Sequence, residues 1–265
     1  MTLPLFAPGA DPGPSFTELL KRSGFAPPQI DPNAPPMEIT HGTTINALRF
    51  ADGVVMSGDR RATAGSTIAN RAMDKVHPAD RWSGVAIAGA AGFALEMVKL
   101  FQLQIEHYEK VEGAVLSLEG KANQLAIMVR NNLPSAMQGL AVIPLFAGYD
   151  LRRQQGRIFT YDVTGGRYEE TDFSTAGSGG RDARTAIKLS WTEGLDRNAA
   201  IELAVVGLYE AADEDSATGG PDAVRGIYPT VATITAEGYE PVPDTEVAER
   251  FAAVIERRTA SGVRR

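Results

Sequence analysis

Thr40-His41-Gly42-Thr43-Thr44-Ile45 is the stretch of this 265-residue chain at which the character of the sequence changes. Before it, residues 1–42 hold nine of the 16 prolines. Because proline fixes φ and donates no backbone hydrogen bond, this leader cannot form much helix or central strand. After it, two short runs of β-branched and apolar residues, 43–50 and 53–60, are joined by the tight-turn pair Asp52-Gly53. The sequence therefore predicts a folded domain that starts with a β-hairpin at residue 43.

The leader itself has two interpretations. Its composition is typical of a disordered tail, and the alternative is a propeptide that is removed. One short helix is predicted within it, at residues 16–22, where Ser15 is suited to be the N-cap and Glu18 to complete a capping box.

Composition excludes several classes of protein. A net charge of -7 and a pI near 5.1 leave no basic block that could neutralise nucleic-acid phosphates. The absence of cysteine excludes disulfides, cysteine catalysis and thiolate metal sites. No apolar run reaches the roughly 18 residues of a membrane helix, and the N-terminus lacks the basic and apolar regions of a secretory signal. We therefore expect a soluble, cytoplasmic protein that does not bind nucleic acid or membranes.

Strands and helices alternate in blocks along the rest of the chain. Hairpin turns between neighbouring strands predict antiparallel sheets, and the helices come in two separate pairs. The predicted fold class is α+β, a four-layer α-β-β-α sandwich of two antiparallel sheets flanked by helix pairs. Beyond the first hairpin, we expect a loop at 66–72, strands at 85–90, 143–149, 157–163, 168–175 and 229–235, helices at 91–111, 117–140, 182–193, 198–213 and 245–257, and a frayed end at 259–265.

Two features of these helices carry further expectations. Pro134 lies inside the 117–140 pattern, so this helix is expected to kink or end early. The 91–111 helix is apolar on more than one face, because Met97, Leu100 and Leu103 add to its main stripe. Such a helix must be covered on both sides, by a sheet and by a second layer or a partner subunit.

Common catalytic motifs are missing from the sequence. It contains no GxSxG, P-loop, GxGxxG or HExxH, and its three histidines (His41, His77 and His107) are scattered, so we expect no metal or cofactor. A Ser-His-Asp triad stays open. The glycine-rich turns at 89–92, 177–180 and 219–220 indicate either tight packing or backbone N–H groups aimed at a substrate oxyanion. The acidic run 213–215 at a helix C-terminus is either solvated or holds a carboxylate for a buried cation or ammonium.

Six short motifs, in order, resemble the β-subunit of the proteasome core particle, most closely the actinobacterial type. The resemblance runs from Gly42 to about Glu256 and implies the N-terminal-nucleophile hydrolase fold, which is the four-layer order predicted above. The motifs are His41-Gly42-Thr43-Thr44-Ile45, Gly58-Asp59-Arg60-Arg61, Lys75, Gly89, Gly177-Ser178-Gly179 and Asp215-Ser216-Ala217-Thr218-Gly219-Gly220.

The resemblance implies that the chain cleaves itself between Gly42 and Thr43. Residues 1–42 would then be a propeptide, and residues 43–265 the catalytic domain. Thr43 would become the new N-terminus, with its hydroxyl as nucleophile and its free α-amine as general base. An α-amine has an ordinary pKa near 7.7–8.0, so it is partly neutral at cytoplasmic pH.

Other positions of the family's site also have counterparts here. Lys75 matches the lysine beside the nucleophile, and Asp59 the aspartate that pairs with it. The Gly89 N–H matches the oxyanion donor. Three positions match groups that order the amine: Ser178, Asp215 and Thr218, the last of which stands where many relatives have serine. Thr63 and Ala91 match positions whose backbone binds the substrate as an added strand. Five positions match residues that line an apolar pocket for the substrate residue before the cut: Ala62, Met73, Ile87, Ala91 and Leu95.

The resemblance also implies an assembly. Seven β-subunits would form a ring, two such rings would stack between α-subunit rings, and a ring-shaped ATPase would deliver unfolded or modifier-tagged proteins. Two alternatives stay open: a non-catalytic ring subunit, which would not need Thr43, Asp59 and Lys75 together, and a small-molecule amidase of the same fold, which would be a monomer or small oligomer with an open pocket.

Overall fold

The computed structural model describes residues 42–260. The predicted leader helix, the rest of residues 1–41 and the residues beyond 260 lie outside the described part. In residues 42–260, no helix is both long enough and apolar enough to cross a membrane.

The first sheet is built around the predicted hairpin, which is confirmed. Phe50 pairs with Gly53 across the turn, and all neighbouring strands in this sheet are antiparallel. The strand order is β10-β1-β2-β11-β12, with β1 (Thr44–Phe50), β2 (Gly53–Gly58), β10 (Phe173–Gly177), β11 (Thr230–Thr235) and β12 (Gly238–Pro241).

The second sheet is an antiparallel meander that follows the chain in the order β5-β6-β7-β8-β9. Its strands are β5 (Val76–Asp80), β6 (Ser83–Gly89), β7 (Val142–Asp150), β8 (Gln155–Tyr161) and β9 (Arg167–Glu170). A separate small hairpin is formed by β3 (Ala62–Ala64) and β4 (Thr67–Asn70).

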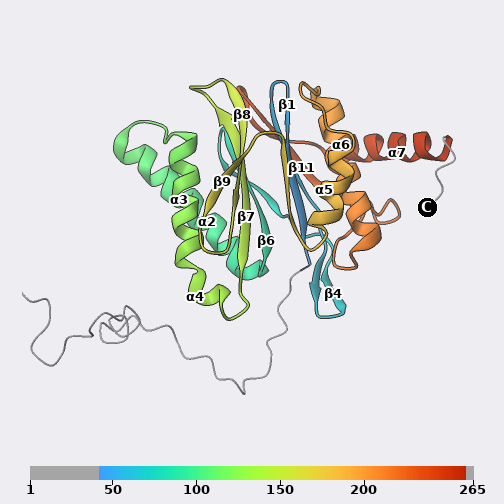
Figure 1. The fold of residues 1–265 in the computed structure, drawn as a ribbon, viewed down its shortest axis with the longest axis horizontal. Helices are drawn as coiled ribbons and strands as arrows, with labels where there is room; N and C mark the ends of the chain where they lie inside the picture. The colour runs from blue at the N-terminus through green and yellow to red at the C-terminus, as the bar shows by residue number, and fades with distance from the viewer. Residues whose placement is uncertain (1–41, 261–265) are drawn as a thin grey trace, which may run out of the picture. The chain divides into compact units, whose positions relative to one another are not determined.

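Helices cover the outer face of each sheet, so the four-layer α-β-β-α prediction is confirmed (Figure 1). On the second sheet lie α2 (Ala91–Glu112) and α3 (Leu118–Asn131), followed by the short α4 (Leu133–Ala136). On the first sheet lie α5 (Gly180–Lys188) and α6 (Arg197–Glu214), and α7 (Asp244–Ala260) packs against α6.

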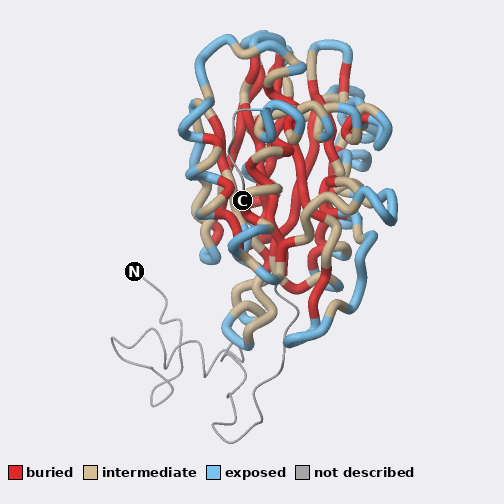
Figure 2. The backbone as a smooth tube through the Cα atoms, turned by 90° about the vertical axis from the view of Figure 1, so that its right-hand side faces the viewer, coloured by how far each residue is buried: buried red, intermediate tan, exposed pale blue. Residues whose placement is uncertain are grey.

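Three apolar cores hold these layers together. One lies between α2, α3 and the second sheet, one between the two sheets, and one between the first sheet and α5, α6 and α7. Figure 2 shows the result, with the buried segments concentrated along the strands and the inner helix faces.

Several predicted boundaries were wrong. The segment 66–72 is not a loop, because β4 lies within it. The predicted strand 168–175 is two strands: β9 pairs with β8 in the second sheet, and β10 pairs with β1 in the first. The helix predicted at 182–193 begins at Gly180 and ends at Lys188. The early end expected for the 117–140 helix is confirmed: α3 ends at Asn131, and Pro134 lies in the first turn of α4, where its missing N–H costs no hydrogen bond.

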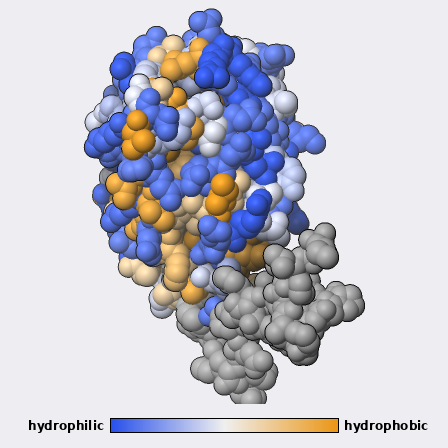
Figure 3. Space-filling view, turned by 90° about the vertical axis from the view of Figure 1, so that its left-hand side faces the viewer, coloured by the Kyte–Doolittle hydropathy of each residue, from blue (hydrophilic) through white to orange (hydrophobic). Residues whose placement is uncertain are grey.

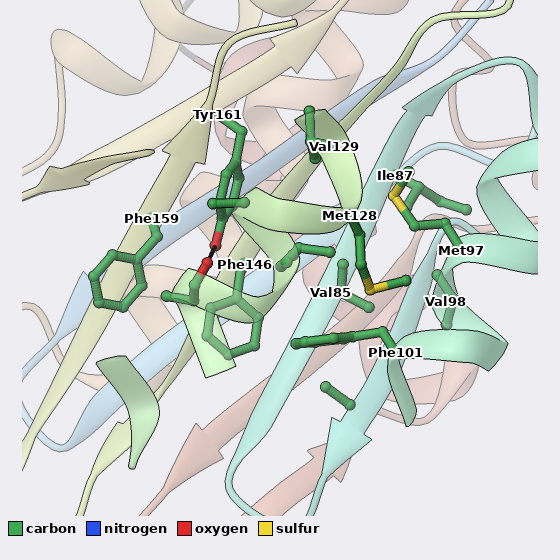
Figure 4. Packing of buried hydrophobic residues seen from close by; sticks show 14 of the residues in the cluster. Val85, Ile87, Met97, Val98, Phe101, Met128, Val129, Phe146, Phe159 and Tyr161 are labelled. Carbon is green, nitrogen blue, oxygen red and sulfur yellow. Dashed lines mark hydrogen bonds between the residues drawn. The ribbon is translucent and has the colours of Figure 1, made fainter. Parts of the chain in front are cut away.

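Phe146 on β7 is the centre of the core beneath α2 and α3 (Figure 4). It is fully buried, meets Phe101 edge-on at 5.7 Å between ring centroids, and stacks on Phe159 at 6.0 Å. Phe146→Ala is expected to lower the free energy of unfolding by about 3–5 kcal/mol, because it opens a cavity that rigid strands cannot close. Urea unfolding measures this, with Phe93→Ala as control because Phe93 is 41% exposed. Equal losses in both variants would contradict it.

The outward face of α2, α3 and α4 carries apolar side chains (Figure 3). Large apolar residues here are 46–65% exposed: Leu100, Leu103 and Val111 on α2, Ile127 on α3, and Met137 directly after α4. The inward face of α2 is buried on the second sheet. The predicted two-sided apolar character of this helix is therefore confirmed, and within residues 42–260 nothing buries its outer side.

Candidate active site

Thr43 lies where β1 begins, at one end of the first sheet, and is 5% exposed. Its hydroxyl donates a hydrogen bond to the carbonyl oxygen of Gly42 at 2.6 Å. Its own carbonyl oxygen accepts the backbone N–H of Ser178 at 2.9 Å, which continues the pairing of β1 with β10. The hydroxyl of Thr43 is thus held against the peptide bond that precedes it.

Gly42 occupies a space that only glycine fits. A Cβ at this position would lie 2.6 Å from the hydroxyl oxygen of Thr63 and 2.7 Å from both the Cβ and the carbonyl oxygen of Ala217. These separations are shorter than any real Cβ contact, so a side chain would push the carbonyl of residue 42 away from the Thr43 hydroxyl.

Lys75 and Asp59 form a buried ion pair beside this peptide bond. Asp59 follows β2, Lys75 precedes β5, and they are 0% and 1% exposed. Lys75 Nζ lies 2.7 Å from Asp59 Oδ1, 3.1 Å from the carbonyl oxygen of Gly42 and 2.5 Å from that of Arg61. Three acceptors match the three donors of an ammonium group. The cation is therefore held by Asp59 and directed at the Gly42 carbonyl.

Burial lowers the pKa of Lys75 below its ordinary value, and the attraction and hydrogen bond of Asp59, with the weaker attraction of Asp215, oppose this shift without reversing it. A lysine with a lowered pKa gives up its proton more readily. Its ammonium is therefore suited both to stabilise a neighbouring oxyanion and to exchange a proton with it.

Ser178, Asp215 and Thr218 form a second polar group on the other side of Thr43. The Ser178 hydroxyl donates to Asp215 Oδ2, and the backbone nitrogen of Thr43 lies 3.4 Å from Ser178 Oγ. The Thr218 hydroxyl also donates to Asp215 Oδ2, at 2.6 Å, and the N–H of Ala217 donates to Oδ1 at 3.1 Å. All three predicted amine-ordering residues therefore meet at one carboxylate.

Asp215 is the C-cap of α6, and its surroundings differ from those of the other two residues of the acidic run 213–215. Asp213 and Glu214 are exposed, whereas the Asp215 carboxylate turns inward to Ser178 and Thr218. Burial raises the pKa of Asp215, but the hydrogen bonds it accepts and the charge of Lys75 outweigh burial, so the net pKa is lowered and the group is ionised. Two of these acidic residues are thus solvated and the third is held inside.

The predicted oxyanion donor, Gly89, ends β6 just before α2. Its φ is +117°, and a Cβ there would lie 2.1 Å from the carbonyl oxygen of Ala141. This crowding requires glycine whether or not its N–H contacts a substrate. Tight packing is therefore enough to explain why residue 89 is a glycine.

The predicted substrate-contact residues occupy several elements. Thr63 lies against Gly42, and Ala62 precedes it on β3. Ile87 on β6 is buried in the core beneath α2, with Leu95 packed against it from the helix. Ala91 is the first residue of α2, and Met73 lies between β4 and β5, where its N–H bonds the carbonyl of Arg60. Their role as a pocket stays a prediction.

Residues that were not predicted as site members complete the surroundings of Asp59. Its carboxylate accepts backbone N–H groups from Thr44 at 2.7 Å, Arg61 at 2.8 Å and Gly219 at 2.9 Å. The Arg61 guanidinium also binds the carbonyl oxygen of Ser216 at 2.9 Å. Backbone donors leave no mark in the residue type, so the available signal was their place inside the quoted motifs, where Thr44, Arg61 and Gly219 lie next to or near Thr43, Asp59 and Thr218.

This arrangement suits acyl transfer. The Thr43 hydroxyl and the buried Lys75 cation both contact the Gly42 carbonyl oxygen, and the Thr43 nitrogen, which would become an amine if the preceding bond were cut, lies 3.4 Å from Ser178 Oγ. A nucleophile, a base within reach and a positive group at the oxygen that becomes charged are the parts such a reaction requires.

The chain is similar to known proteins over its whole length. Residues 39–225 match the family model described as "Proteasome subunit", a range that contains all the predicted site residues. A protein named "Proteasome subunit beta" from Acidimicrobium ferrooxidans is 59% identical over 266 residues, covering 100% of this chain and 97% of its own. Another of the same name, from Streptomyces griseus, is 59% identical over 222 residues, covering 84% of this chain and 79% of its own.

Proposed function

The chain belongs to the proteasome subunit family, among its β-subunits, and we propose that it is a catalytic member: a threonine endopeptidase of the proteasome core particle, made as a precursor. The observation that carries this proposal is that the carbonyl oxygen of Gly42 accepts hydrogen bonds from both Thr43 Oγ1 and Lys75 Nζ. A non-catalytic subunit needs neither contact.

The first reaction we propose is cleavage of the chain's own Gly42–Thr43 bond. The Thr43 oxygen adds to the carbonyl carbon, its proton passes to the Thr43 nitrogen, and the C–N bond breaks to leave an ester. Water then hydrolyses the ester, which releases the leader with a new carboxylate and leaves Thr43 with a free amine. Lys75 Nζ, 3.1 Å from the carbonyl oxygen, stabilises the negative charge that develops there.

The same groups would then hydrolyse protein substrates. Before cleavage the Thr43 nitrogen is an amide and cannot act as a base, whereas the freed α-amine can take the hydroxyl proton. The contact of this nitrogen with Ser178 supports a role for Ser178 and Asp215 in orienting the amine. Gly89 is proposed as the oxyanion donor, Thr63 and Ala91 as strand-like backbone contacts, and the apolar residues around Ile87 as a pocket that favours apolar side chains.

We propose that the subunit works in the cytoplasm, in stacked seven-membered β-rings flanked by α-rings and served by a ring-shaped ATPase. The apolar outer face of α2, α3 and α4 supports burial against another subunit. Substrates would be unfolded or modifier-tagged proteins, and no cofactor takes part in the proposed chemistry.

N-terminal sequencing and intact mass of the assembled particle test the proposal. We expect the subunit to have lost 42 residues and to begin at Thr43, with an electrophilic peptide inhibitor attached to that residue. A particle that hydrolyses peptides while its β-chain keeps an intact Gly42–Thr43 bond would rule the mechanism out.

A further inference from the structure

Thr44, the residue after the proposed nucleophile, is linked by hydrogen bonds to both carboxylates of the site, directly to Asp59 and through Thr218 to Asp215. Its backbone N–H donates to Asp59 Oδ1 at 2.7 Å. Its side-chain oxygen lies 2.5 Å from that of Thr218, which in turn donates to Asp215. Thr44 is 0% exposed, so no water replaces these partners from bulk solvent. The polar groups of this one residue therefore join the lysine side of the site to the amine side.

The direction of each hydrogen bond in this group follows from what each atom can donate. A hydroxyl has a single proton, and an ionised carboxylate only accepts. Thr218 uses its proton for Asp215 Oδ2 at 2.6 Å, so in its contact with Thr44 it must accept. Thr44 is therefore the donor to Thr218, and its own oxygen accepts the backbone N–H of Gly179 at 3.1 Å.

A one-way chain of hydrogen bonds results, from the Gly179 N–H through the hydroxyls of Thr44 and Thr218 to the Asp215 carboxylate. A second chain reaches the same oxygen from the Thr43 nitrogen through Ser178. Hydrogen bonds in such chains polarise one another, so each donor strengthens the next.

The packing around Gly179 holds the Thr44–Thr218 hydroxyl pair in place. A Cβ on Gly179 would lie 2.6 Å from the Thr44 oxygen and 2.9 Å from the Thr218 oxygen. The two hydroxyls thus fill the space above this glycine, and Gly179 adjoins Ser178, the residue that contacts the Thr43 nitrogen. A shift of these two hydroxyls would therefore alter both hydrogen-bond chains that end at Asp215.

We propose that Thr44 is a positioning residue for peptide hydrolysis. Its hydroxyl acts through Thr218 to orient the Asp215 carboxylate toward Ser178. This inference rests on the proposed function of Thr43. Asp215, once fixed, accepts the hydrogen bond that the Ser178 hydroxyl donates, so the lone pairs of Ser178 face the Thr43 nitrogen. The charged groups around this arrangement are Asp59 and Lys75 on one side and Asp215 on the other.

The test compares Thr44→Val, which keeps the shape but removes the hydroxyl, with Thr44→Ser, which keeps the hydroxyl but removes a methyl. Loss of one hydrogen-bonding group of this kind is expected to lower kcat about tenfold in Thr44→Val. KM should change by less than about twofold, because the hydroxyl does not touch the substrate. Thr44→Ser should stay close to wild type.

Thr233→Val is the matched control, since Thr233 is 1% exposed on β11 of the same sheet. It should keep wild-type kcat. If Thr44→Val behaves like Thr233→Val, the proposal is wrong. If Thr44→Val does not fold, Thr44→Ser is the deciding variant. A tenfold loss of kcat in Thr44→Ser would show that activity depends on the methyl group of Thr44 and not on its hydroxyl, and would contradict the proposal.

A double-mutant cycle with Thr218→Val tests whether the two hydroxyls act in one chain. The double variant should lose little more than Thr218→Val alone, and fully additive losses would contradict the chain. Thr43→Ala separates this proposal from the one it rests on. An active Thr43→Ala enzyme would overturn the proposed function, whereas an inactive one beside a normal Thr44→Val enzyme would overturn only the role of Thr44.

Discussion

Replacing Thr43 with alanine is expected to abolish both processing and peptide hydrolysis while the fold is retained. Without the hydroxyl there is no nucleophile to attack the Gly42 carbonyl, so the leader stays attached and the residue 43 nitrogen stays an amide. Loss of a catalytic nucleophile typically costs many orders of magnitude, and we expect a decrease in kcat of about 10⁴-fold or more. Intact mass reports processing, and hydrolysis of a fluorogenic peptide reports activity.

Thr43→Ser is the control for this substitution, because it keeps a hydroxyl at the same position and should still process and hydrolyse. A second control separates the two reactions: the Thr43→Ala chain is made with a leader that an added protease removes after residue 42. This trimmed chain should still be inactive. Hydrolysis near the wild-type rate in either alanine chain would exclude Thr43 as nucleophile.

Lys75→Met is expected to have the next largest effect. The variant keeps the length of the side chain but removes the charge that lies 3.1 Å from the Gly42 carbonyl oxygen. Loss of one such stabilising group typically lowers kcat by about 10²–10³-fold. It also leaves the buried Asp59 carboxylate without its cation, so the free energy of unfolding should fall by about 3–5 kcal/mol. Peptide hydrolysis and urea unfolding measure the two effects.

Lys121→Met provides a matched control, since Lys121 is also buried and paired with an aspartate, Asp80. Asp80 ends β5, whereas Lys75 lies just before that strand begins. The control should lose stability but keep kcat in the molecules that remain folded. The Asp59→Asn, Lys75→Met double variant should regain stability without regaining activity. Equal losses of kcat in the Lys75 and Lys121 variants would mean that stability alone explains the effect.

The layered fold could be predicted because its central elements have clear local patterns. The hairpin of β1 and β2 has two short runs rich in β-branched and apolar residues around an Asp-Gly turn, and α2 has a regular apolar stripe. The elements that were missed lack such patterns. β5 contains Pro78, which argues against a central strand, but β5 is an edge strand of its sheet, where proline is tolerated. β4 has no buried residue in its pattern, so no alternation marks it.

The candidate active site could not be predicted from local patterns, because its residues are distant in sequence. Thr43, Lys75 and Asp215 come together only through the pairing of strands and the end point of α6, which no local pattern specifies. Their selection depended on the order of short motifs shared with a known family. That resemblance named side chains, and it gave no indication of the Thr44 hydroxyl, whose role follows from distances and from the count of available protons.

The pairing of β1 on both sides has a consequence for the chain end that cleavage would create. A new N-terminus ordinarily frays, because its first residues have few partners. Here the strand that begins at Thr44 is bonded to β2 on one edge and β10 on the other, and the Thr43 carbonyl is already bonded to Ser178. The conformational entropy of the terminal residue is therefore lost during folding, before any substrate arrives, and amide exchange at Thr44 should be as slow as in the middle of the sheet.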